Sequence, residues 1–304
     1  MFSESQSSIA VRPRNLLFQS SFADYIALTK PGIAAAVLMS AMAGFFLASP
    51  ASLSLINWKI FFHTIFGTAL LSCGAGTLNM LLEMEPDALM NRTKNRPLPS
   101  GRVQPEEAFF IGAICASLGV VHIASMVNLL SGFLAGVSLA LYLVFYTPMK
   151  KASALCTVIG AVSGAIPPLI GWSAAAQSLN AQALSLFLIL FVWQFPHILA
   201  LAWMYREDYS RAGFKMVPLP DLKGSLTAWS SLVLSLALVA LGTLPYWLNM
   251  SGRIYLFGSL VLGGTLVVAA VRFFLNRNHA TAKKMFLASV FYIPLLLGLM
   301  VAGR

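Results

Sequence analysis

The sequence predicts an all-helical integral membrane protein with about nine transmembrane helices, and three observations support this. The 304 residues are 58% hydrophobic and only 10% charged, with a mean hydropathy of +0.79, which is outside the range of ordinary soluble domains. Apolar segments long enough to cross a bilayer recur along the chain. If these segments alternate in direction, 17 of the 20 Lys and Arg residues fall on one side of the membrane.

Nine apolar segments have the length of a membrane span, about 20 residues. In chain order they cover residues 32–49, 60–82, 107–126, 128–147, 155–175, 183–205, 225–248, 254–274 and 284–302. They are too long and too continuously apolar for the alternating strands of a membrane β-barrel, so we expect helices. The chain is therefore expected to form one polytopic domain over residues 31–304, preceded by a cytosolic tail over residues 1–30.

The positive charges give each segment its direction. With the N-terminus inside, the inner side collects Arg12, Arg14, Lys30, Arg92, Lys94, Arg96, Arg102, Lys150, Lys151, Arg206, Arg211, Lys215, Lys223, Arg272, Arg277, Lys283 and Lys284. Lys59, Arg253 and Arg304 remain on the outer side. This asymmetry predicts a cytoplasmic N-terminus, and it supports the count of nine because the loss of one segment would scramble the alternation.

The N-terminal tail does not have the pattern of a secretory signal, because it lacks a short apolar core followed by a small-residue cleavage site. The short tail favours a bacterial cell inner membrane. A mitochondrial inner membrane is the alternative, since the tail is rich in Ser and contains Arg12 and Arg14, although Glu4 and Asp24 count against a presequence.

Composition disfavours several functional classes. A net charge of +10 would suggest nucleic-acid binding in a soluble protein, but here membrane topology explains it. Cys73, Cys115 and Cys156 lie far apart inside apolar segments, which argues against disulfides and against a thiolate metal site. All ten Asp and Glu residues fall on the inner side or at inner segment ends, whereas transporters and channels usually carry ionisable groups at mid-membrane.

A weak internal repeat relates two inner loops. Asp87 precedes the tripeptide PLP at 97–99 by ten residues, and Asp208 precedes a second PLP at 218–220 by the same distance. The repeat suggests two related halves, about 31–150 and 151–304, that each contribute one polar loop to a shared inner cavity.

The first polar loop, residues 79–101, has the composition of a magnesium and diphosphate site. Asn79, Glu83 and Asp87 are spaced four residues apart, which places their side chains on one helix face near its inner end. Two carboxylates and an amide oxygen suit Mg²⁺. Arg92 and Arg96 follow directly, and guanidinium groups bind phosphate oxygens through paired hydrogen bonds. The alternative is a solvated helix end with topogenic charges.

The second polar loop, residues 204–224, offers acids for a second Mg²⁺, namely Glu207, Asp208 and Asp221. Its bases are Arg206, Arg211 and Lys215. The fourth segment ends at the same surface with Tyr146, Lys150 and Lys151. Lys150 is a candidate phosphate contact, with a purely topogenic charge as the alternative.

A metal-bound diphosphate at a membrane surface implies a lipid-like tail that runs into the bilayer. If the bridging bond is allylic, Mg²⁺ and basic residues stabilise the leaving diphosphate, and the tail becomes a carbocation that an electron-rich acceptor captures. The two loops therefore indicate prenyl transfer.

Three stretches resemble the signatures of the UbiA superfamily of membrane prenyltransferases, and specifically of its heme branch. The first, residues 79–101, reads NMLLEMEPDALMNRTKNRPLPSG. The second, within residues 146–172, contains YTPMKK and GAVSGAIPPLIGW, and the third, residues 193–218, reads WQFPHILALAWMYREDYSRAGFKMVP. The resemblance covers residues 28–297.

The resemblance implies a nine-helix UbiA-type bundle with a central cavity that opens to the cytosolic side. It implies Mg²⁺ as cofactor, farnesyl diphosphate as donor and heme B as acceptor, with heme O, the precursor of heme A, as product. Asn79, Glu83 and Asp87 would bind diphosphate through Mg²⁺, and Asp208 would belong to the second metal loop. Heme A synthase or terminal-oxidase assembly proteins are the expected protein partners.

The remaining substrate-binding candidates are Tyr146, Lys151, Trp193, Gln194, Glu207, Tyr209 and Arg211. His197 is expected to orient heme B, because neutral imidazole is a common axial ligand of heme iron; a hydrogen-bonded core histidine is the alternative. His63, His122 and His279 are expected to be structural.

The chain departs from the family pattern in two places. Glu207 and Asp208 are adjacent, where the wider superfamily has a spaced acid pair, and Cys156 stands where many relatives carry Asn. Two other functions are considered: prenyl transfer to a quinone precursor or chlorin, and non-enzymatic carriage of heme or a lipid diphosphate. The sequences WQFPH and DYSRAG argue against the first.

Overall fold

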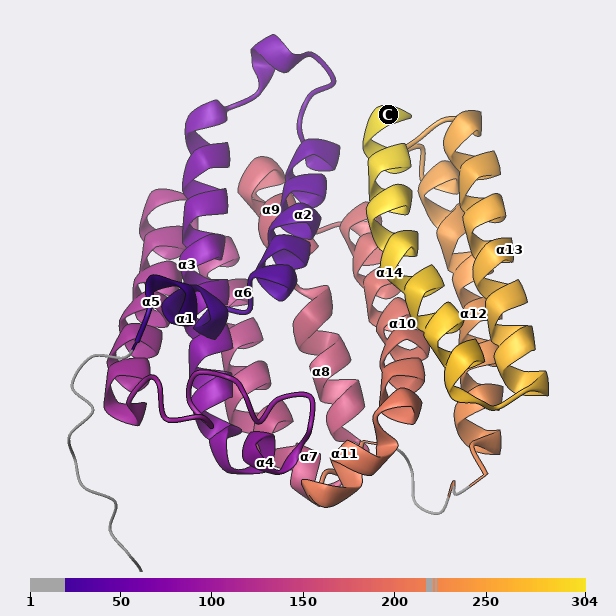
Figure 1. Ribbon diagram of the computed structural model, residues 1–304. Coiled ribbons are helices and arrows are strands. Elements are labelled where there is room, and N and C mark those ends of the chain that lie inside the picture. Colours follow the sequence, from indigo (N-terminus) through magenta and orange to yellow (C-terminus); the bar gives the residue numbers. More distant parts are fainter. Residues whose placement is uncertain (1–19, 217–220, 222) are drawn as a thin grey trace, which may run out of the picture.

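The computed structural model describes residues 20–216, 221 and 223–304. This part of the chain is helical throughout and contains nine stretches that are long and apolar enough to cross a membrane, as predicted. The uninterrupted ones are α2 (Pro31–Ala48), α3 (Trp58–Leu82), α5 (Pro105–Met126), α10 (Ala181–Met204), α12 (Ser225–Trp247), α13 (Arg253–Leu275) and α14 (His279–Ala302). All nine stand side by side in one bundle (Figure 1).

The fourth and fifth spans are interrupted. The fourth consists of α6 (Leu129–Ala140), the π-helical η2 (Leu141–Tyr146) and α7 (Thr147–Ala152), and the fifth of α8 (Cys156–Ala165) and α9 (Pro167–Ala176). π-helical turns are rare and occur often at functional sites. Pro167 begins α9, where its missing N–H costs little. In the fifth span 67% of the residues are buried, a larger share than in any other span, so α8 and α9 form the centre of the bundle.

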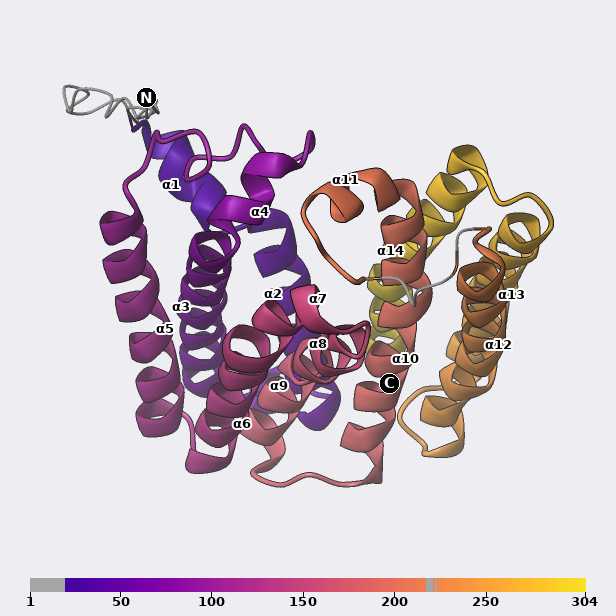
Figure 2. The ribbon, with the colours of Figure 1, turned by 90° about the horizontal axis from the view of Figure 1, so that it is seen from below.

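Short helices gather at one end of the bundle. They are α4 (Met84–Leu89), α7 and α11 (Arg206–Arg211), and we call this the polar end; the C-terminus lies at the opposite end (Figure 1). The view from below shows the short helices α4 and α11 next to each other at this end (Figure 2). The short η1 (Leu53–Leu55) links α2 to α3 at the other end.

Two helix starts differ from the sequence expectation. The last span begins at His279 rather than at residue 284, because the side chain of Asn278 accepts a hydrogen bond from the N–H of Thr281 (2.9 Å) and caps the helix. The expected tail contains α1 (Phe22–Leu28), whose first turn is closed by a capping box between Ser21 and Asp24. Capping by small polar residues extends helical structure beyond the apolar segments.

Some expectations lie outside the described residues. These are the placement of Glu4, Arg12 and Arg14 in the tail, and the second PLP at 218–220. The division of the chain into two related halves therefore stays a prediction.

Small residues allow the helices that carry the polar end to pack closely. A Cβ atom at Gly74 or Gly119 would overlap the backbone between α3 and α5, and one at Gly171 would overlap the backbone of Ala41 between α2 and α9. In a bilayer, helices associate largely through such close packing, because lipid is as apolar as the side chains. α3 and α5 thus form a rigid platform for the loop that joins them.

Candidate active site

The three polar residues of the first loop lie on one buried face, as predicted. Asn79 is in the last turn of α3, Glu83 ends that helix and Asp87 lies in α4, and their exposed fractions are 0%, 5% and 1%. Helical hydrogen bonds continue across the junction, since the N–H of Asp87 donates to the carbonyl of Glu83 (2.8 Å). Burying two carboxylates is costly unless each is paired with a charge or with hydrogen-bond donors.

Two basic residues pair with these carboxylates. Lys150 of α7 donates to Glu83 Oε1 (2.5 Å), and Arg96 of the following loop donates to Asp87 Oδ2 (2.6 Å). The Lys150 ammonium also lies 4.4 Å from the centre of the Tyr146 ring, a cation–π distance. The structure therefore brings together the predicted residues Glu83, Asp87, Arg96, Tyr146 and Lys150.

Lys30 is a member of this cluster that sequence reasoning had counted only as a topogenic charge. It donates to Asn79 Oδ1, while Asn79 Nδ2 donates to Thr147 Oγ1 (2.8 Å). Lys30 occupies the left-handed region (φ 51°) at the junction of α1 and α2, which turns its side chain into the site. The sequence does not predict the left-handed conformation of Lys30, because a Lys before a Pro at the start of an apolar segment has no special preference for it.

Burial and mutual attraction have opposite effects on the charges of the cluster. Loss of hydration lowers the pKa of Lys30 to about 7, although Glu83 partly opposes the shift. Burial alone would raise the pKa of Glu83, but the ammonium groups of Lys150 and Lys30 outweigh it and leave that pKa below its ordinary value. When all groups are charged, the three bases exceed the two buried carboxylates by one, which favours an anionic ligand.

Asp208 connects the second loop to the first. Its carboxylate accepts hydrogen bonds from the backbone N–H groups of Asn91 and Arg92, both at 3.2 Å, and forms an ion pair with Arg211. Burial raises the pKa of Asp208, but these donors outweigh it and the pKa is lowered. The Arg92 guanidinium lies 5.0 Å from the Tyr205 ring centre. The two predicted loops thus meet through a carboxylate that already has several protein partners.

Four other candidates take no part in the ion pairs of the buried cluster. The side chain of Glu207 is 87% exposed, and it forms only a long ion pair with Arg206, at 4.0 Å. Asp221 caps α12 by accepting from the N–H of Thr227 (2.7 Å). Tyr209 packs against Phe214, and burial raises its pKa. Lys151, at the end of α7, is exposed.

The donor atoms fit Mg²⁺ better than a transition metal. Within the described ranges, no three His, Cys, Asp or Glu side chains lie close enough to hold a metal by themselves. Asn79, Glu83 and Asp87 offer buried hard oxygen atoms, which suit Mg²⁺ when water or phosphate oxygens complete its coordination. Glu85, between them in sequence, is exposed and faces away from the cluster.

A cavity of about 230 Å³ begins beside Lys30 and Tyr146 and extends toward Leu71 and Ile170. Its wall is mostly apolar, and the stacked rings of Tyr142 and Tyr146 (centroids 5.5 Å apart) belong to it. Predicted Gln194 also lines it: the amide nitrogen donates to the carbonyls of Ala161 and Leu190, which leaves Oε1 as a free acceptor.

Thr68 is the second unusual polar group of this cavity. Its buried hydroxyl has no hydrogen-bond partner among the described residues, whereas Thr64 and Thr77 of the same helix donate to the carbonyl four residues earlier. Such back-bonding normally satisfies a helical Thr. Thr68 and Gln194 therefore give an otherwise apolar cavity two places for a polar atom or a water molecule.

Trp193 and His197 face α14 and do not line this cavity. Trp193 Nε1 donates to the carbonyl of Ser289 (2.7 Å), and His197 Nδ1 lies 2.9 Å from Ser289 Oγ. Because the Ser289 hydroxyl donates its single hydrogen to the carbonyl of Phe286 (2.6 Å), it must accept from His197. This assigns the ring hydrogen to Nδ1 and the lone pair to Nε2.

Residues expected to be structural behave as such. Buried Cys156 lies with its sulfur 3.9 Å from the sulfur of Met216 in a small apolar cluster, so this side chain serves packing. His63 and His122 form a hydrogen bond with each other (3.1 Å) between α3 and α5. His279 begins α14.

Comparisons with known proteins agree with the geometry. Residues 37–295 match the UbiA prenyltransferase family. The protoheme IX farnesyltransferase of Solibacter usitatus is 42% identical over 92% of this chain and 98% of the relative. That of Koribacter versatilis is 37% identical over 92% of this chain and 93% of the relative.

Solved structures share the fold at low identity. The first belongs to work on the biosynthesis of digeranylgeranylglyceryl phosphate synthase in membranes; it has a TM-score of 0.76 at 20% identity and covers 92% of this chain and 97% of its own. The second is a UbiA homolog from Archaeoglobus fulgidus bound to GPP and Mg²⁺. It has a TM-score of 0.64 at 17% identity and covers 91% of this chain and 99% of its own.

Replacing Asp208 tests whether this carboxylate holds the first loop. In Asp208→Asn, we expect faster tryptic cleavage after Arg92 and Lys94, because the neutral amide binds Arg211 and the two backbone N–H groups less strongly. Cleavage is followed by mass spectrometry. Glu207→Gln, at the exposed neighbouring position, is the control and should be cleaved like the unchanged protein. Equal cleavage rates in both variants would show that Asp208 does not hold the loop.

Proposed function

The chain belongs to the UbiA prenyltransferase family, and we propose that its polar end transfers the farnesyl group of farnesyl diphosphate to a vinyl group of heme B. The bond between the farnesyl carbon and the diphosphate oxygen breaks, diphosphate is released, and a water molecule adds its hydroxyl group to the other vinyl carbon and loses a proton, which gives heme O. One observation carries the proposal: a buried cluster of bases and carboxylates, built from the first loop, α7 and the junction of α1 and α2, lies directly beside an apolar cavity. The sequence identity of 42% and 37% with two protoheme IX farnesyltransferases, over 92% of this chain, supports the choice of substrates.

The bases of the cluster bind the diphosphate. Lys30, Arg96 and Lys150 now neutralise protein oxygens, and a diphosphate offers them stronger acceptors. Asn79, Glu83 and Asp87 thereby become available to hold Mg²⁺ beside the diphosphate, with Asp208 and Arg92 at the edge of the site. The Archaeoglobus fulgidus homolog with GPP and Mg²⁺ supports this pairing. When bound, Mg²⁺ stabilises the negative charge that develops on the leaving diphosphate.

The cavity receives the farnesyl tail. Its volume of about 230 Å³ is below that of typical ligand pockets, roughly 300 Å³ or more, which favours a slender chain over the broad heme ring. Tyr142 and Tyr146 present aromatic faces near the diphosphate-binding bases, where they stabilise the positive charge of the allylic carbon as its bond to oxygen breaks. The apolar wall excludes bulk water, which would capture the cation.

His197 orients the heme B acceptor in this proposal. Ser289 holds the imidazole so that Nε2 carries the lone pair, which is the form that binds iron. The orientation of a ligating histidine is commonly set in this way, by a hydrogen bond to its other nitrogen.

We further propose that the polar end faces the cytoplasm of a bacterial inner membrane. Lys59 and Arg253 begin α3 and α13 at the opposite end, together with Arg304, while the other described Lys and Arg residues belong to the polar side in the predicted topology. The bacterial sources of the relatives agree with this membrane. Association with heme A synthase or terminal-oxidase assembly proteins stays a prediction.

Product analysis tests the proposed function. Purified protein in lipid nanodiscs is incubated with heme B, farnesyl diphosphate and Mg²⁺, and the pigment is examined by mass spectrometry. We expect a mass increase equal to one farnesyl group plus one hydroxyl group, because water adds across the vinyl group with the farnesyl group and loses a proton. Farnesylation of an added quinone precursor instead would indicate the related transferase, and binding of both ligands without released diphosphate would indicate a carrier.

Removal of either buried carboxylate should stop turnover. Glu83→Ala and Asp87→Ala are each expected to lower kcat by about 100-fold or more, the scale of losing an electrostatic catalytic group, while heme binding persists. Glu85→Ala alters an exposed acid in the same stretch and serves as the control. If both variants stay active at limiting Mg²⁺, the metal assignment is wrong.

Heme absorption tests the role of His197. His197→Ala should shift the Soret band of bound heme B because an iron ligand is lost, whereas Ser289→Ala should cause a smaller shift because the ring loses only its orienting hydrogen bond. An unchanged spectrum in His197→Ala would remove this residue as the ligand and leave it as a hydrogen-bonded core histidine.

A further inference from the structure

The loop between α4 and α5, residues 90–104, carries Arg92 and Arg96, and its turns are held by hydrogen bonds within the loop and by contacts with other elements. Asp208 fixes one end through the N–H groups of Asn91 and Arg92. The remainder lies next to α1, a short helix that the proposed reaction does not use.

A small apolar cluster, separate from the main core, lies beneath this loop. It joins Leu28 of α1 to Leu98 and Val103 of the loop, and it rests on Met80 of α3 and Ala108 of α5. The exposed fractions of these five side chains are 3% or less. The loop and α1 therefore share one apolar contact, so movement of α1 would expose apolar surface on both.

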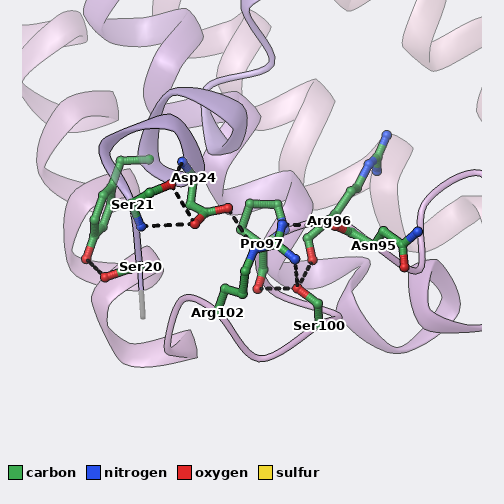
Figure 3. Close-up of polar contacts among 9 residues, drawn as sticks. Ser20, Ser21, Asp24, Asn95, Arg96, Pro97, Ser100 and Arg102 are labelled. Carbon is green, nitrogen blue, oxygen red and sulfur yellow. Dashed lines mark hydrogen bonds and ion pairs between the residues drawn. The ribbon is translucent and has the colours of Figure 1, made fainter. Parts of the chain in front are cut away.

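Arg102 forms a polar latch across this cluster (Figure 3). Its guanidinium donates through Nε to Asp24 Oδ1 (2.9 Å), through Nη1 to Ser100 Oγ (2.7 Å) and through Nη2 to the carbonyl of Asn95 (3.0 Å). The other oxygen of Asp24 accepts from the N–H and the hydroxyl of Ser21, both at 3.0 Å. Arg102 thus ties the N-terminal turn of α1 to two points on the loop.

The latch continues to the diphosphate-binding residues. Ser100 donates from its hydroxyl (2.7 Å) and its N–H (3.0 Å) to the carbonyl of Arg96, whose side chain pairs with Asp87. At its other end α1 leads into Lys30, which reaches Asn79. One hydrogen-bonded path therefore runs from Asp24 through Arg102 and Ser100 to Arg96.

We infer that Asp24 and Arg102 are positioning residues, and that α1 is a strap that holds the loop in the shape that presents Arg96 to the diphosphate. The identity of the substrate in this inference rests on the proposed function, whereas the contacts between α1 and the loop do not depend on it. The side chains of Asp24 and Arg102 are 11% and 38% exposed, so the guanidinium reaches water and removal of Asp24 leaves no fully buried unpaired charge. The effect of the latch is therefore expected in the loop rather than in the fold as a whole.

Kinetics with farnesyl diphosphate test the strap. In Asp24→Ala, KM for this substrate should rise about tenfold (about 1.4 kcal/mol), because Arg96 is no longer held in place, while kcat and the midpoint of thermal unfolding change little. Asp24→Asn keeps an acceptor for Arg102 and should lie between Asp24→Ala and the unchanged protein. Arg102→Lys should resemble Asp24→Ala, because an ammonium group cannot bridge three acceptors in fixed directions.

The matched control is Tyr25→Phe. It removes the contact of α1 with Glu107 of α5 (Tyr25 Oη to Oε2, 3.3 Å) but leaves the latch intact. KM in this variant should equal that of the unchanged protein. An equal rise in KM in the control and in Asp24→Ala would show a general disturbance of α1, and would overturn the specific role of the latch.

Amide hydrogen exchange, measured without substrates, separates failure of the strap from failure of the proposed function. Residues 94–102 should exchange faster in Asp24→Ala and Arg102→Lys, because the hydrogen bonds within the loop lose their support. If the unchanged protein makes no farnesylated heme but exchange rises as expected, the reaction is wrong and the strap stands. Unchanged exchange and unchanged KM in both variants would overturn the strap, as would a lower unfolding midpoint with unchanged KM.

Discussion

Two carboxylates, Glu83 and Asp87, are buried at the end of an otherwise apolar bundle, and the polar end is built around their charge. An ion removed from water loses several kcal/mol of hydration unless partners replace it. Here Glu83 pairs with Lys150 of α7, and Asp87 pairs with Arg96 of the loop before α5. Lys30, from the junction of α1 and α2, lies beside them and binds Asn79. The same ion pairs that make burial possible therefore draw these elements together.

The pairing also leaves the site ready for an anion. In the proposed reaction, each base is already held in place by a protein oxygen when the diphosphate binds, so little side-chain ordering would oppose binding. The carboxylates that this exchange would release carry the oxygen donors that Mg²⁺ prefers. The wider π-helical turn carries Tyr142 and Tyr146, which line the apolar cavity, and the Tyr146 ring lies beside the Lys150 ammonium, so aromatic faces are present where the cavity meets the charged residues.

The sequence predicted the features that depend on local periodicity. Apolar runs predicted nine spans, and a spacing of four residues placed Asn79, Glu83 and Asp87 on one face. It did not predict the place of Lys30, because a left-handed residue between two helices is determined by how those helices pack. Nor does any residue in the stretch LYLVFY mark the π-helical turn, whose extra residue per turn is accommodated by tertiary contacts.

The second loop shows how helix geometry limits an adjacent acid pair. Neighbouring residues on a helix point about 100° apart, so only one of Glu207 and Asp208 can face the first loop. Asp208 does so and accepts two backbone N–H groups, while Glu207 is exposed. A metal ion at Asp208 would have to displace Arg211, but the backbone contacts could remain, because a carboxylate oxygen accepts more than one partner. Asp208 can therefore join the two loops and also bind a second metal ion.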